Sequence, residues 1–314
     1  NTFYGQRTGK AINTGDFCTA VGSEALKTAT TGQNNTAIGS VAMQNTTTGQ
    51  HNTAVGRYSL TSNTTASFNA SLGFSSLYGN TTGAQNTGLG AYALNTNTTG
   101  SNNTALGYKA LYSNTTADAN TAVGYEALTA STGTGNRNAA VGYQALKDNT
   151  TGWGTVAVGQ SAGKAQTTGS NNVAVGYQAL MTNTTGWGIT AVGNDAAKVS
   201  TVNHTTAIGY GALLANTTGA QNTVVGSLST YQNTTGGYNT AVGYDTLANQ
   251  TTGSYNTALG NAALTANTTG SNNTAIGYSA GNAITTGVQN VAIGQEALKA
   301  CTTSQGNIAI GAQA

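Results

Sequence analysis

The stretch from Asn103 to Ala119 reads NTALGYKALYSNTTADA, and variants of this 17-residue unit fill the rest of the chain. One glycine in each unit fixes the register of the repeat. The spacing between these glycines is 17 residues, except for one residue more before Gly142 and one fewer before Gly209. Because nothing else interrupts the array, the sequence predicts one repetitive domain over residues 1–314. The register glycines are Gly5, Gly22, Gly39, Gly56, Gly73, Gly90, Gly107, Gly124, Gly142, Gly159, Gly176, Gly193, Gly209, Gly226, Gly243, Gly260, Gly277, Gly294 and Gly311.

The local chemistry of the unit predicts strands and turns. The Thr-Ala-Val segment before the glycine is typical of a short strand, and Asn-Thr-Thr-Gly is typical of a tight turn. Tyr-x-Ala-Leu could add one helical turn, although so few residues do not form a stable helix alone. One unit cannot bury its own apolar face, so the units must stack. We therefore predict an all-β fold, a parallel β-solenoid or β-roll of about eighteen coils, with short helical turns as an option.

Stacked coils require narrow walls and internal hydrogen bonds. We expect Ala and Val to form one wall of the core, and Ala and Leu to form another. An Asn precedes the strand in most units, and stacked amides can hydrogen-bond along the array. The predicted Asn ladder comprises Asn35, Asn52, Asn69, Asn86, Asn103, Asn120, Asn138, Asn172, Asn222, Asn239, Asn256, Asn273, Asn290 and Asn307.

The composition excludes several classes of function. Only 6% of the 314 residues are charged, none is proline, and the formal net charge is +2. Such a charge gives no electrostatic basis for binding nucleic acid or an anionic membrane. No apolar run reaches the roughly 18 residues of a transmembrane helix, so we expect no membrane insertion. Because the chain starts at Asn1, we expect a processed product or a piece of a longer fibre.

Catalysis needs irregular polar residues that converge in a pocket, and here the polar residues repeat instead. His51 and His204 lie about nine units apart, and the acidic residues are scattered. Glu24 with Lys27, and Glu296 with Lys299, resemble surface ion pairs. No glycine-rich phosphate loop and no spacing of metal ligands is present. The sequence therefore predicts a protein that is not an enzyme and that carries no cofactor or metal.

Aromatic residues are the best candidates for contacts with a ligand or another subunit. Seven Tyr directly follow a register glycine, and the two Trp are 34 residues apart. A stripe of aromatics could stack on sugar rings or on a partner chain. The alternative is that Tyr packs over the turn or forms a seam between subunits. The candidates are Tyr108, Tyr125, Tyr143, Tyr177, Tyr210, Tyr244, Tyr278, Trp153 and Trp187.

Two further features leave alternatives open. Cys18 and Cys301 are the only cysteines, and they are either unpaired small residues or partners in a disulfide between molecules of a filament. Paired Thr residues such as Thr98 and Thr99 recur before the corner glycine. A flat Thr array could bind ice-like water, or it could be a β-surface chosen for propensity.

The repeat resembles two known families. Asn172-Val173-Ala174-Val175-Gly176 and residues 290–294 resemble the head repeats of trimeric autotransporter adhesins, which implies β-rolls that trimerise and bind host surfaces. The longer unit over residues 172–186 is similar to repeats of bacteriophage tail fibres that end in an endosialidase-type chaperone. The resemblance covers essentially the whole chain.

These observations predict a structural or adhesive rod at a cell surface, outside the cell or on a virion. It would self-associate, as a homotrimer, and attach to a surface glycan or receptor. One alternative is a solenoid that polymerises end to end into an extracellular filament. Another alternative is a monomeric ice-binding solenoid.

Overall fold

The computed structural model describes residues 1–314, which form three-residue parallel strands joined by turns, with no helix. The chain divides into two compact units, unit 1 (Asn1–Thr155) and unit 2 (Val156–Ala314). Each unit is a parallel β-solenoid, which confirms the predicted fold class. The strands of unit 1 are β1 (Thr2–Tyr4), β2 (Thr19–Val21), β3 (Thr36–Ile38), β4 (Thr53–Val55), β5 (Ala70–Leu72), β6 (Thr87–Leu89), β7 (Thr104–Leu106), β8 (Thr121–Val123) and β9 (Ala139–Val141).

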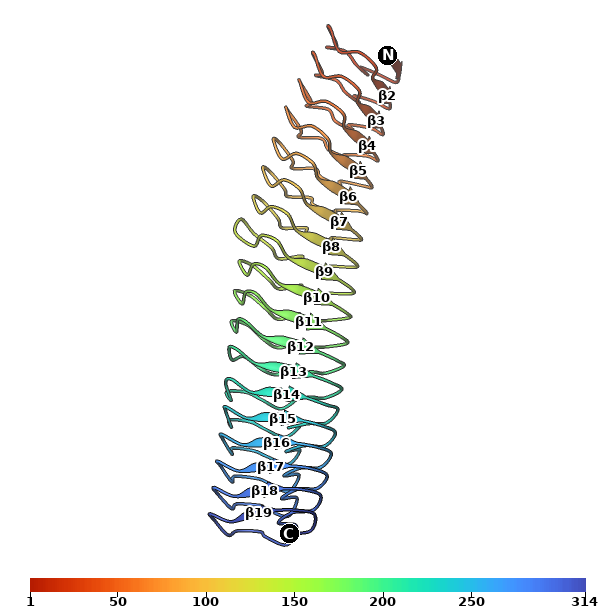
Figure 1. Ribbon diagram of the computed structural model, residues 1–314. Helices are drawn as coiled ribbons and strands as arrows, with labels where there is room; N and C mark the ends of the chain where they lie inside the picture. Colours follow the sequence, from red (N-terminus) through yellow and green to blue (C-terminus); the bar gives the residue numbers. More distant parts are fainter. The chain divides into compact units, whose positions relative to one another are not determined.

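Unit 2 repeats the same arrangement with ten strands. They are β10 (Val156–Val158), β11 (Val173–Val175), β12 (Thr190–Val192), β13 (Thr206–Ile208), β14 (Thr223–Val225), β15 (Thr240–Val242), β16 (Thr257–Leu259), β17 (Thr274–Ile276), β18 (Val291–Ile293) and β19 (Ile308–Ile310). Within each unit every strand lies beside the next one along the chain (Figure 1). Equivalent residues are therefore in register, as Thr104 is with Thr121 and Leu106 with Val123.

The register glycine is required by the stacking of the coils. Gly22 has a φ of +132°, a conformation that residues with a side chain rarely adopt. A Cβ at Gly22 would lie 2.6 Å from the carbonyl oxygen of Gly39 in the next coil. The backbone of one coil therefore occupies the space that a side chain would need, and only glycine fits at this corner.

The Tyr-x-Ala-Leu segment is not a helical turn, so the option of short helical turns is not realised. Lys109 and Leu111 have φ values of 53° and 50°, in the left-handed region. Their N–H groups donate in opposite directions, from Lys109 to the carbonyl of Ala91 at 3.1 Å and from Leu111 to that of Ala127 at 3.0 Å. A helix would need these N–H groups for its own carbonyls, but here the neighbouring coils on both sides use them.

The expected wall of Ala and Val is also wrong. In the strand β7 the middle residue Ala105 is fully buried, whereas Leu106 is 45% exposed. Successive side chains of a strand point to opposite faces, so only the middle residue of three can face the core. The narrow coil accommodates Ala at that position, and the volume of the core comes from Ala110 and Leu111, both fully buried. The Val, Ile or Leu before each register glycine therefore points outward.

The predicted Asn ladder is confirmed. Asn103 is fully buried, its Oδ1 accepts the N–H of Asn120 at 2.9 Å, and its Nδ2 donates to the carbonyl of Ala117 at 2.9 Å. Both polar groups of the amide are thus satisfied by the next coil, as burial demands. The ladder is interrupted where Thr155, Ile189 and Thr205 take the position of the Asn.

A second file of buried Asn comes from the Asn-Thr-Thr-Gly turn, where the sequence predicted a turn but no ladder. Asn97 Nδ2 donates to Asn80 Oδ1 at 2.7 Å and to the carbonyl of Gly100 at 2.9 Å. The amide side chain therefore closes its own turn and also joins two coils. The fully buried members of this file are Asn63, Asn80, Asn97, Asn114, Asn149, Asn183, Asn216, Asn233 and Asn267.

Candidate contact surfaces

The outward side of the strands is a surface of Thr and aliphatic side chains, which we call the strand face. The first and third residues of each strand point outward, and parallel register aligns equal side chains between coils. Among the aliphatic members, Leu72 is 48% exposed and Leu106 is 45% exposed in unit 1. In unit 2, Val156 and Val158 are 41% and 39% exposed. Contiguous exposed apolar surface of this kind marks interaction sites in soluble proteins.

Three of the predicted Tyr form a continuous stack at one edge of the strand face in unit 1. Tyr108, Tyr125 and Tyr143 each follow a register glycine, which places their rings at the end of successive strands. The ring centroids of Tyr108 and Tyr125 are 5.3 Å apart, and those of Tyr125 and Tyr143 are also 5.3 Å apart, with interplanar angles of 20° and 9°. All three side chains are exposed, so the stack presents a flat aromatic edge to solvent.

The stack continues towards the amino terminus through residues that were not among the predicted contacts. Tyr92 contacts Tyr108 edge-on at 6.1 Å between ring centroids, and Phe74 contacts both Tyr92 at 5.3 Å and Tyr58 at 5.9 Å. Tyr58 and Tyr92 lie two residues after a register glycine instead of one, and this shift hid them. We call the six residues the aromatic ribbon: Tyr58, Phe74, Tyr92, Tyr108, Tyr125 and Tyr143.

The aromatic ribbon borders a hollow and carries cations. Tyr58, Phe74 and Tyr92, with Tyr78, line an open hollow of about 410 Å³. The guanidinium of Arg57 lies 4.5 Å from the centroid of the Tyr58 ring, and the Lys109 ammonium lies 5.3 Å from that of Tyr108. These cation–π contacts place one cation against each of two rings of the ribbon.

The predicted Tyr of unit 2 form a spaced file. Tyr177, Tyr210, Tyr244 and Tyr278 are between 44% and 56% exposed and occur in alternate coils. Smaller side chains, including Asn194, occupy the same position in the coils between them. Unit 2 therefore offers separate aromatic contacts where unit 1 offers a continuous stack.

The two Trp occupy a different corner from the Tyr, at the other end of the strand. Trp153 in unit 1 and Trp187 in unit 2 both precede the strand, each followed by a glycine, and are 49% and 46% exposed. The ring of Trp187 contacts that of His204 edge-on, with centroids 4.2 Å apart. Each Trp therefore lies before its strand, whereas the predicted Tyr lie after theirs, so the Trp and the Tyr do not share one aromatic stripe.

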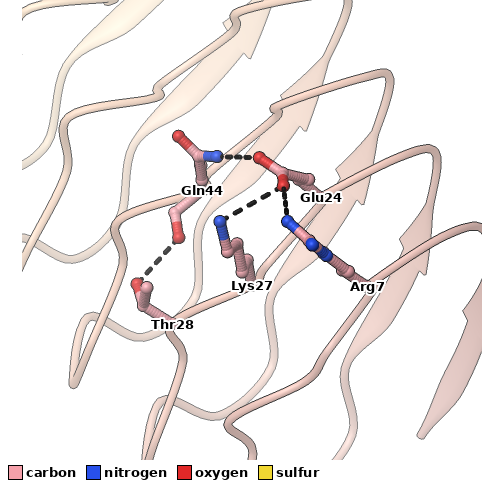
Figure 2. Close-up of polar contacts among 5 residues, drawn as sticks. All are labelled: Arg7, Glu24, Lys27, Thr28 and Gln44. Carbon is pink, nitrogen blue, oxygen red and sulfur yellow. Dashed lines mark hydrogen bonds and ion pairs between the residues drawn. The ribbon is translucent and has the colours of Figure 1, made fainter.

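Polar side chains bridge successive coils near the start of unit 1 (Figure 2). The Glu24 carboxylate accepts hydrogen bonds from Arg7 of the preceding coil at 3.3 Å and from Lys27 at 3.2 Å, and Gln44 of the next coil also donates to it. The hydrogen bond from Lys27 lowers the pKa of Glu24 below its ordinary value of 4.5. The predicted pair of Glu24 and Lys27 is confirmed, and Lys299 with Glu296 forms the equivalent pair at 2.8 Å in unit 2.

The paired Thr residues divide into two files with different roles. The hydroxyl of Thr98 donates to the carbonyl of Thr115 in the next coil at 2.9 Å, so the first Thr of each pair joins coils. The second Thr, such as Thr99, is exposed to solvent. Only the second file, together with the outward Thr of the strands, remains for contact with water or a ligand.

The cysteines are free in the structure. Cys18 is 2% exposed, and its thiol donates to the carbonyl of Gly32 at 3.4 Å. Cys301, in unit 2, is half-buried. A disulfide between molecules would require the coil around Cys18 to open, and the predicted link between Cys18 and Cys301 stays a prediction.

In the structure no group of three His, Cys, Asp or Glu side chains lies close enough together to hold a metal ion. It also contains no helix with the length and apolar character needed to cross a bilayer. Comparison of the chain with family models and with curated proteins finds no match. Surface geometry is therefore the basis for inferring function.

Proposed function

We propose that the protein is a structural and adhesive solenoid displayed outside a cell or on a virion, as the shaft of an adhesin or tail fibre. In this role its copies associate side by side, as a trimer, through the strand face. The observation that carries the proposal is the outward file of Val, Ile and Leu, which leaves side chains such as Leu72 and Leu106 nearly half exposed. Burial of such a file against a second copy removes apolar surface from water at roughly 25 cal/mol per Å².

A second copy fits this surface because it has the same period. The strands in each unit stand in register, so aliphatic rows recur at the strand spacing of about 4.8 Å. Two identical solenoids can therefore align row with row over many coils. The aromatic ribbon lies beside the strand face and would supply the contacts with a glycan or receptor.

Light scattering on the purified chain tests the association. We expect a stable trimer, and a triple variant Ile38→Thr, Leu72→Thr and Leu106→Thr should shift the mass towards the monomer, because it removes three apolar rows of unit 1 and keeps strand propensity. A matched variant with Thr36→Ser, Thr53→Ser and Thr104→Ser on outward positions should keep the trimer. A clean monomer for the unmodified chain contradicts the proposal, and long polymers unaffected by the triple variant favour the end-to-end filament.

Ice binding is the second candidate, and the in-register outward Thr of the strands favour it. Thr104 pairs with Thr121, and similar pairs follow in most coils. A thermal hysteresis assay on the monomeric fraction tests this candidate. Freezing-point depression that is lost in the variant with Ser on the strand face would replace the adhesive proposal.

A further inference from the structure

One corner of unit 2 departs from the repeat and is hollow. Other coils carry one small residue after the Thr pair, most often a glycine such as Gly186 or Gly219, but the coil between Gly193 and Gly209 lacks a residue at this position. Its turn runs directly from Thr201 and Val202 to Asn203, which accounts for the one residue missing from the spacing. An open hollow of about 590 Å³ lies at this corner, lined by the short turn and by the coils on either side.

Aromatic rings line the corner hollow on two sides. Trp187 comes from the coil before the short turn and is 46% exposed, and Tyr238 lies three coils further on and is 53% exposed. Stacked strands are about 4.8 Å apart, so these two rings span ~14 Å. The ring of Tyr255 stacks on that of Tyr238 at 4.8 Å and holds it in place.

Contacts with its neighbours hold the Trp187 side of the hollow in place. The backbone N–H of Trp187 donates to Asn203 Oδ1 at 3.0 Å, and the N–H of His204 donates to the carbonyl of Trp187 at 3.2 Å. A Cβ on Gly188 would lie 3.3 Å from His204 Nδ1, so the glycine after Trp187 makes room for the imidazole. These contacts place the Trp187 and His204 rings against each other before any ligand binds.

Between the aromatic rings the lining combines neutral polar side chains with the small apolar side chains of Val202 and Ala220. Asn203, Gln221 and Thr185 contribute amides and a hydroxyl, which both donate and accept hydrogen bonds. No Asp, Glu, Lys or Arg lines the hollow. A sugar ring offers an apolar face for stacking on an aromatic ring and hydroxyls for amides, whereas an acidic sugar or a phosphate would find no Lys or Arg here.

We propose that the corner hollow of unit 2 is a binding site for a short neutral oligosaccharide, which stacks on Trp187 and Tyr238 and hydrogen-bonds to Asn203 and Gln221. The inference rests on the proposed attachment function for the origin of the saccharide, a glycan on the attached surface. A shallow site with so few contacts has an expected affinity of about 1 mM for one short chain, which many copies in one assembly would multiply.

Tryptophan fluorescence can follow binding at this site alone, because the chain has only Trp153 and Trp187. In a Trp153→Phe variant, titration with neutral oligosaccharides of glucose, galactose, mannose or N-acetylglucosamine should change the emission of Trp187. The acidic trisaccharide sialyllactose should bind at least about tenfold more weakly. The matched Trp187→Phe variant, which keeps Trp153, should show no change. No response to any neutral oligosaccharide up to about 10 mM overturns the proposal.

Two variants test the geometry. Tyr238→Ala should weaken binding about tenfold, since one stacking platform is lost. A glycine inserted between Val202 and Asn203 restores the 17-residue spacing and should fill the corner and abolish binding, while circular dichroism shows an intact fold. Retained binding in the insertion variant overturns the proposal.

Light scattering on the same samples separates this site from the proposed function. A chain that self-associates but binds no neutral saccharide overturns the site alone. A monomer that binds saccharide through Trp187 supports the site and contradicts the self-association.

Discussion

Ser76 and Gly88 illustrate how a residue in one turn limits the choice of a residue in a nearby strand. Most coils have Ala at both positions, but here Ser76 Oγ donates to the carbonyl of Gly88 at 2.9 Å. A Cβ on Gly88 would lie 2.6 Å from Ser76 Oγ. In the adjacent coils the Ser59 hydroxyl donates to the Ser71 hydroxyl at 2.6 Å. A short series of hydrogen-bonded Ser side chains therefore takes the place of alanines in the core.

This contact predicts a coupling between the two positions. Gly88→Ala alone should lower the free energy of unfolding by about 1–3 kcal/mol, because the added methyl group overpacks against Ser76. Ser76→Ala/Gly88→Ala restores the usual alanine pair and should recover about 1–2 kcal/mol of that loss. Urea denaturation of the wild type, both single variants and the double variant measures the coupling. A double variant no more stable than Gly88→Ala would show that the steric contact is not the cause.

At the scale of the element, the sequence predicts the strands well and their facing poorly. The register glycine and the strand propensity of Thr-Ala-Val locate every strand, and the burial of Asn103 follows from its position in the repeat. Alternation in three residues does not say which side is the core. The prediction placed both Ala and the aliphatic residue after it on one wall, whereas Ala105 faces the core and Leu106 faces outward. The left-handed φ values of Lys109 and Leu111 accompany hydrogen bonds to the preceding and the following coil, which no local pattern reveals.

The candidate sites show the same limit. The Tyr that follow register glycines are visible in one repeat, but the contact between Tyr92 and Phe74 depends on side chains from different positions of successive coils. The one-residue deletion before Gly209 is plain in the sequence. The hollow beside Trp187 depends on which residue of the turn is missing. An alignment of the turns of all coils would have shown that the small residue after the Thr pair is absent here.

An ion pair between coils predicts a dependence of stability on pH. Lys147 Nζ lies 2.7 Å from Glu126 Oε2, and Gln144 also donates to that carboxylate at 3.0 Å. The hydrogen bond with Lys147 lowers the pKa of Glu126 below 4.5, and Glu126 raises the pKa of Lys147 above 10.5. The contribution of Glu126 to the stability of the folded state is therefore complete above pH 4.5, and it is lost as the pH falls through its lowered pKa. The contribution of Lys147 to the stability of the folded state is complete below pH 10.5, and it is lost as the pH rises through its raised pKa.

We expect Glu126→Gln to destabilise unit 1 by under about 1 kcal/mol at pH 7, since both side chains are partly exposed. At an acidic pH below the lowered pKa of Glu126 the wild-type carboxylate is protonated, so the two proteins should have equal stability there. Calorimetric unfolding at both pH values provides the measurement, with Lys147→Gln as the reciprocal variant. An equal loss at both pH values would mean that packing, and not charge, underlies the effect.

At the scale of the molecule, the coil is the unit by which length can change. Deletion of residues 257–273, which removes β16 and one whole repeat, joins Asn256 to Thr274 in the original register. Because each coil contacts mainly its neighbours, the shortened chain should keep its circular dichroism per residue and its thermal midpoint within a few degrees. Deletion of residues 257–265 removes half a coil and should lower the midpoint strongly. Similar midpoints for both deletions would contradict the solenoid register.

The hydrogen bonds between coils bear on the covalent chain itself. Neighbouring coils are held together by hydrogen bonds all around the coil. Examples are those from the N–H groups of Lys109 and Leu111 and from the side-chain amide of Asn103. A protease that cuts an exposed turn would break one peptide bond and leave those contacts in place. Within a unit the peptide link between coils is therefore nearly dispensable once folding is complete. A nicked unit should survive as an assembled whole until a denaturant separates its pieces.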